Sequence, residues 1–189
     1  MAILILGLVV FFAVHSLRIV SPAMRDGLVA RIGEMPWRGL YSVVSFIGLG
    51  LIIYGFGLAR QDPIAVYDPP SWGRHITMLL VLLAFIAIAV SLLPPGKLKP
   101  MLKHPMLAGI KLWAFGHLLA NGDLASILLF GAFLAWAVVD RIALKRRPGV
   151  VLPKPGPVKY DVLAVVLALV VYGLFVARLH LALIGVPVV

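Results

Sequence analysis

The sequence predicts an all-α fold, a polytopic transmembrane helix bundle, and three observations support this. Apolar residues make up 62% of the 189 residues and charged residues only 13%, and the mean hydropathy is +1.09. A soluble domain of this length has no core large enough to bury so much apolar side chain. The apolar residues also form long uncharged stretches, and most charges lie between these stretches. Hydrocarbon is therefore expected to be the solvent for much of the surface.

Six stretches are long enough, or nearly so, to cross a hydrocarbon core of about 30 Å. A single helix over 105–139 would be about 50 Å long, and it would contain the turn signal Asn121-Gly122-Asp123. We therefore expect a hairpin there and six spans in all, with five spans as the alternative. Residues 1–189 are expected to form one transmembrane domain. The predicted spans are about 1–19, 39–59, 75–96, 105–121, 123–141 and 161–179.

The placement of Lys and Arg predicts the orientation, because cytoplasmic loops of membrane proteins are rich in these residues. Thirteen basic residues follow the first, third and fifth spans, and only three lie after the others. Both termini are thus expected outside, in the bacterial cytoplasmic (inner) membrane. Topology and contact with the lipid bilayer then explain the net charge of +10, and no nucleic-acid partner is expected. The thirteen are Arg18, Arg25, Arg31, Arg38, Lys97, Lys99, Lys103, Arg141, Lys145, Arg146, Arg147, Lys154 and Lys159; the three are Arg60, Arg74 and Arg178.

The connections between spans carry local signals. Ser21-Pro22 has the pattern of an N-cap followed by Pro at the first helical position, which predicts a short interfacial helix. Residues 148–157 are rich in Pro and Gly and are expected to form an extended cytoplasmic linker. The first span lacks the charge pattern and cleavage site of a signal peptide. The glycines of the second span are expected to permit close helix packing; they are Gly48, Gly50, Gly55 and Gly57.

A few ionisable side chains lie at membrane depth, where they are costly and usually face a partner or a cavity. Neutral imidazoles can serve as axial ligands of haem iron, and an apolar bundle provides a slot for the porphyrin. Several pairs of histidines lie at membrane depths that would let them ligate one haem, so depth does not select a pair. At each position the alternative is a structural histidine that is hydrogen-bonded between helices. The cysteine-free sequence excludes thiolate ligands, and hydrolase motifs are absent. The side chains in question are His15, Lys111, His117, Arg178 and His180, with His75 and His104 at helix starts.

Three segments strongly resemble the NnrU family of bacterial membrane proteins associated with nitrite and nitric oxide metabolism. They are His15-Ser16, the stretch HPMLAGIKLWAFGHLLANGD, and the closing HLALIGVPV. The family also includes 15-cis-zeta-carotene isomerase, a haem b enzyme. The resemblance implies that haem b is the cofactor and that His15 and His117 ligate its iron, with His104 and His180 as reserve candidates. Ala114 stands where the isomerase has a Cys proposed as an alternative ligand.

The resemblance implies a haem b membrane protein that supports nitrite or nitric oxide (denitrification-related) metabolism as a redox, sensing or assembly factor. Redox or nitrogen-oxide reductase proteins are its expected partners. The first alternative is an enzyme, a haem-dependent cis–trans isomerase of a polyene or other isoprenoid, with no catalytic residue assigned. The second alternative is a structural bundle without a cofactor. Lys111, six residues from His117, is expected to pair with a haem propionate, because a charged ammonium at that depth needs an anion.

The basic asymmetry yields a testable topology. Fusions of alkaline phosphatase and of a cytoplasm-only fluorescent protein to Val189 should give phosphatase activity without fluorescence, because six spans return the C-terminus to the outer face. The opposite result would leave a five-span protein.

Overall fold

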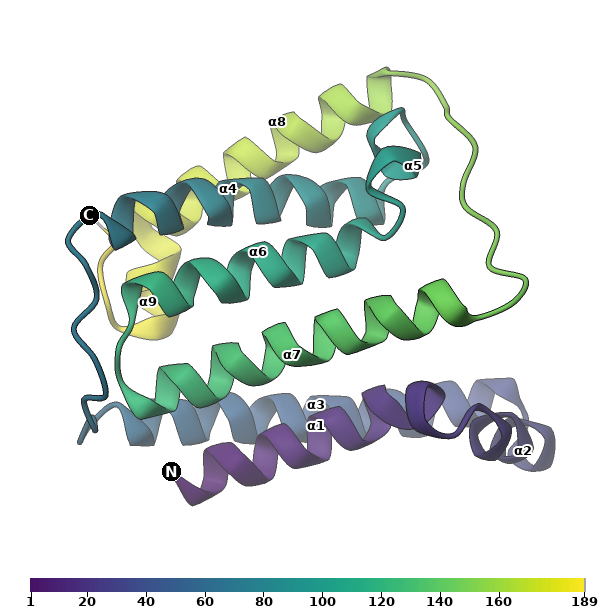
Figure 1. The fold of residues 1–189 in the computed structure, drawn as a ribbon, viewed down its shortest axis with the longest axis horizontal. Coiled ribbons are helices and arrows are strands. Elements are labelled where there is room, and N and C mark those ends of the chain that lie inside the picture. Colours follow the sequence, from purple (N-terminus) through teal and green to yellow (C-terminus); the bar gives the residue numbers. More distant parts are fainter. Residues whose placement is uncertain (189) are drawn as a thin grey trace. The chain divides into compact units, whose positions relative to one another are not determined.

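The computed structural model describes residues 1–188, and over that range it is all-helical apart from one isolated β-bridge between Ala65 and Asp123 (Figure 1). The predicted fold class is therefore confirmed. The last helix contains a π-helical turn, η1, between α8 and α9. The elements are α1 Ala2–Val20, α2 Pro22–Ile32, α3 Glu34–Ala59, α4 Gly73–Leu92, α5 Leu98–Leu102, α6 Pro105–Ala120, α7 Leu124–Arg146, α8 Lys159–Leu174, η1 Phe175–Leu179 and α9 His180–Ile184.

A helix occupies each of the six predicted spans. Five helical stretches within residues 1–188 are long and apolar enough to cross a membrane, so the chain has the features of a multi-pass membrane protein. The sixth, α6, has 16 residues, and its length of about 24 Å falls short of the hydrocarbon core. The five stretches are α1, α3, α4, α7 and the continuous helix Lys159–Ile184.

The turn predicted in the fourth stretch is present. Helix α6 ends at Ala120, and α7 starts at Leu124, so a single long helix is excluded. The Asp123 carboxylate caps the start of α7, since it accepts hydrogen bonds from the Ser126 backbone N–H (2.9 Å) and hydroxyl (2.6 Å). The backbone N–H of Leu124 also donates to the Ile64 carbonyl at 2.8 Å, which ties this turn to the segment after α3.

The secondary structure predicted for two further segments is present. The short helix α2 begins at Pro22 with Ser21 as its N-cap, although the Ser21 side chain makes no capping hydrogen bond. The segment between α7 and α8 contains no helix, as its Pro and Gly content predicts.

Contacts within the chain group into two compact units. Unit 1 consists of Met1–Tyr67 with Gly122–Ala132, and unit 2 consists of Asp68–Asn121 with the chain from Phe133 onward. Helix α7 contributes its first part to unit 1 and the rest to unit 2. The expectation of one transmembrane domain stays a prediction.

In unit 1, α1 and α3 pack antiparallel with their backbones in contact. A Cβ atom on Gly55 would lie 2.3 Å from the Leu4 backbone nitrogen, and one on Gly7 would lie 2.6 Å from that of Ile52. A Cβ on Gly48 would lie 2.8 Å from the backbone nitrogen of Phe11. Close packing is thus confirmed for Gly48 and Gly55, whereas Gly50 and Gly57 face open space.

In unit 2, α4 packs against both α6 and α8 (Figure 1). Gly73, at the start of α4, leaves room for the Leu119 carbonyl, and Gly109 of α6 leaves room for Ile88. At the other end of α4, the Asp161 carboxylate accepts backbone hydrogen bonds from Lys97 (2.7 Å) and Leu98 (3.1 Å). Asp161 therefore joins the first turn of α8 to the start of α5.

Replacing Gly55 by Ala is expected to destabilise unit 1 by about 1–3 kcal/mol, because the added methyl group overlaps the backbone of α1. Gly57→Ala is the matched control in the same helix, since nothing lies within 4 Å of its Cβ position. Thermal unfolding in detergent measures both, and equal melting temperatures would refute the backbone contact.

Candidate functional site

His15 lies on α1 and is partly buried. Its Nδ1 atom is 2.7 Å from the carbonyl oxygen of Phe11, one turn earlier in the same helix. The imidazole stacks on the Phe11 ring, with 3.9 Å between centroids, and the Tyr41 ring of α3 lies 5.1 Å away. The ring is thus held by one hydrogen bond and by aromatic neighbours from two helices of unit 1.

His117 has a similar arrangement on α6, in unit 2. Its Nδ1 atom is 2.8 Å from the carbonyl oxygen of Trp113, again one turn earlier. The Trp113 ring lies 5.4 Å from the imidazole and itself packs against Phe133. The His117 carbonyl accepts hydrogen bonds from the backbone (3.0 Å) and side-chain (2.8 Å) N–H groups of Asn121, which close the end of α6.

These hydrogen bonds determine the tautomer of both imidazoles. A carbonyl oxygen only accepts, so Nδ1 must carry the proton in each case, and in a neutral ring the lone pair is on Nε2. Histidine ligands of metal ions are usually held in this way, with the second nitrogen donating to a backbone carbonyl or carboxylate. His15 and His117 each have the donor chemistry that haem iron requires, and they belong to different units.

Helix α4 supports the turn of α6 that carries His117. The buried Thr77 hydroxyl lies 2.5 Å from the Gly116 carbonyl of α6 and 2.8 Å from the Gly73 carbonyl of its own helix. A Cβ on Gly116 would lie 3.3 Å from the Cβ of Leu80, so α4 and α6 pack closely at this turn. The residue before His117 is therefore fixed by both a hydrogen bond and close packing.

His180 begins α9, directly after the π-helical turn. Its Nδ1 atom is 2.7 Å from the Val186 carbonyl oxygen, so its ring is also bonded to the backbone. Arg178 lies within the π-helical turn and is exposed.

The two histidines at helix starts have different surroundings. His75 is exposed on the first turn of α4. His104 is the N-cap of α6 and follows Lys103, whose φ of 61° allows the His104 N–H to reach the Leu102 carbonyl at 2.6 Å. Partial burial lowers the pKa of His104, Arg141 lowers it further, and Asp140 raises it. Within residues 1–188, no cluster of three metal-ligating side chains is found.

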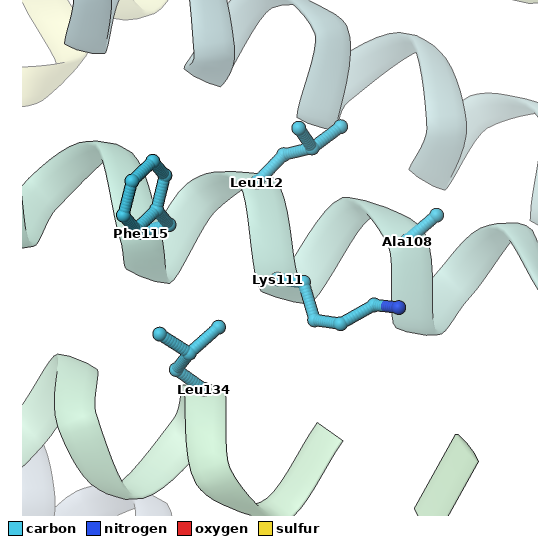
Figure 2. A pocket seen from close by; sticks show the side chains of 5 residues that line it. All are labelled: Ala108, Lys111, Leu112, Phe115 and Leu134. Atoms are coloured by element: carbon cyan, nitrogen blue, oxygen red, sulfur yellow. The ribbon is translucent and has the colours of Figure 1, made fainter. Parts of the chain in front are cut away.

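Lys111 lines an open apolar groove of about 410 Å³ between α6 and α7. Figure 2 shows its side chain running along α6 toward Ala108, with Leu134 of α7 on the opposite wall. Its position on α6 is about 120° around the helix from His117, and His117 does not line the groove. The pairing of Lys111 with a haem propionate stays a prediction.

A family model described as NnrU protein matches residues 3–188. The chain belongs to the NnrU family. The resemblance noted in the sequence is thereby confirmed over nearly the whole length. No curated protein and no solved structure matches the chain.

Sequence reasoning missed three residues of this NnrU-family chain that position its helices or site. Tyr41 contacts His15 from α3, and Thr77 bonds the residue before His117. Asp161 joins segments that are more than 60 residues apart. The sequence signal was weak for each of the three residues. Asp161 gave the strongest signal, because an acidic residue is uncommon at the start of an apolar span.

Thr77→Val is expected to destabilise the protein by about 0.5–1.5 kcal/mol, because it removes a buried interhelical hydrogen bond at nearly constant volume. Thr77→Ser keeps the hydroxyl and should retain more of the stability of the wild-type protein. Thermal unfolding of both variants in detergent gives the comparison, and a Val variant as stable as wild type would contradict the bond's role.

Proposed function

We propose that this NnrU-family protein binds haem b through His15 and His117 and supports nitrite or nitric oxide metabolism as a redox, sensing or assembly factor. The observation that carries the proposal is the matching geometry of the two side chains. Each Nδ1 lies within 2.8 Å of the carbonyl one turn earlier, which leaves the ligand lone pair on Nε2. An aromatic residue at that earlier position supports each ring.

The protein's contribution follows from these contacts. Nδ1–H donation to a carbonyl raises the basicity of Nε2 and fixes the ring orientation, both of which strengthen binding to iron. Apolar helices around the haem would give it a low-polarity pocket. Bound haem would supply one-electron chemistry and affinity for diatomic gases. Lys111 lies about 120° around α6 from His117, and its pairing with a haem propionate stays a prediction.

The isomerase alternative lacks the Cys that is proposed as an alternative haem ligand in 15-cis-zeta-carotene isomerase. Ala114 is completely buried and provides no thiol for ligand exchange. A strain that expresses this protein and receives 9,15,9′-tri-cis-zeta-carotene is therefore expected to show no efficient conversion. Efficient conversion would show that the protein is an isomerase and would contradict the proposed accessory role.

The cofactor proposal predicts a Soret band and a low-spin reduced spectrum for the purified protein. His15→Ala and His117→Ala should each lose haem or convert it to high spin, because each removes one axial ligand. His75→Ala is the matched control, since His75 is exposed. Wild-type spectra for both ligand variants would exclude this pair, and a parallel His180→Ala variant tests the reserve ligand.

A further inference from the structure

The strongest unassigned feature of the molecule is the groove that carries Lys111. It is lined by one cation and four apolar side chains, and three of these four come from one face of α6 at helical spacing. The lining residues are Ala108, Lys111, Leu112, Phe115 and Leu134. Leu134 belongs to the part of α7 that lies in unit 2, so the groove lies within a single unit.

The Lys111 ammonium has no counter-ion among residues 1–188. Across residues 1–188, its Nζ atom makes no hydrogen bond and no ion pair. Lys111 is partly buried and six residues beyond the first residue of α6, about 9 Å along the helix. A charge at such depth is costly unless an anion or water meets it, so the groove favours an anionic occupant.

The groove also has a direction. In Figure 2 the Lys111 side chain extends toward Ala108, that is, toward the N-terminal end of α6, whereas Phe115 lies toward the other end of the helix. This is the orientation of a lysine that reaches toward the membrane surface. Beyond that end of α6 lie the basic residues Lys103 and Arg141, which act electrostatically on His104. The Lys111 end of the groove thus points toward these two basic residues, and Leu112 and Phe115 lie toward the C-terminal end of α6.

We propose that this groove binds an anionic phospholipid, with the phosphate at Lys111 and an acyl chain along Leu112, Phe115 and Leu134. A single cation beside an apolar wall matches an anionic headgroup that is followed by an acyl chain. Basic pockets between transmembrane helices are known to hold anionic headgroups. The groove volume of about 410 Å³ accommodates part of one acyl chain. Lipid binding here requires no haem.

Native mass spectrometry of the detergent-purified protein tests the lipid site. Phosphatidylglycerol and phosphatidylcholine with identical chains are titrated separately, and the ratio of their apparent Kd values is the readout. Wild type is expected to prefer phosphatidylglycerol. In Lys111→Met the ratio of the two Kd values is expected to fall about fivefold. Lys111→Arg should keep it. Lys145→Met is the matched control, because Lys145 is an exposed lysine of α7.

A second variant tests the apolar part of the groove. Ala108→Phe fills it while leaving the ammonium in place, so both lipids should bind more weakly, with Lys111 unchanged. Haem content is measured on every variant. A Lys111→Met protein that binds lipid like Lys145→Met overturns the lipid site. If this variant also loses haem, the anion is the propionate that the sequence predicts; if it keeps haem, Lys111 has neither role.

Discussion

Close approach of helix backbones at glycine is the constraint on which the two units depend. Inside a bilayer, apolar side chains gain little by leaving lipid for a neighbouring helix, so association depends on close packing and on interhelical hydrogen bonds. In unit 1 the missing Cβ of Gly55 leaves space for the backbone at Leu4. In unit 2 the missing Cβ of Gly73 leaves space for the Leu119 carbonyl. Any side chain at these glycines would force the pairs apart.

This packing also determines where the two candidate ligands lie. Gly48 contacts the backbone of Phe11, and the carbonyl of Phe11 accepts the hydrogen bond from His15. On α6, Gly116 precedes His117 and is held by the hydroxyl of Thr77. In both cases a close contact at a glycine positions the helix turn beside the histidine against the neighbouring helix. The histidine geometry is therefore a property of helix pairing as much as of the local sequence.

Much of this architecture could be predicted because its determinants are local. Long uncharged stretches specify helices in lipid, and Asn121-Gly122-Asp123 ends a helix for reasons of backbone conformation. The spacing of Trp113 and His117 places them one helical turn apart, but the side-chain rotamer that brings Nδ1 to the carbonyl depends on packing. The bonds of Asp161 to the start of α5 depend on the pairing of distant segments. Nothing in the neighbouring sequence specifies them.

The direction of the Nδ1 bonds bears on what the histidines are for. Here Nδ1 of His15 and of His117 donates to its own helix, and Nδ1 of His180 donates to the segment just after α9. These three bonds orient the rings but do not join one long helix to another. In the proposed haem site the same ring orientation would leave Nε2 of His15 and of His117 as the iron ligands.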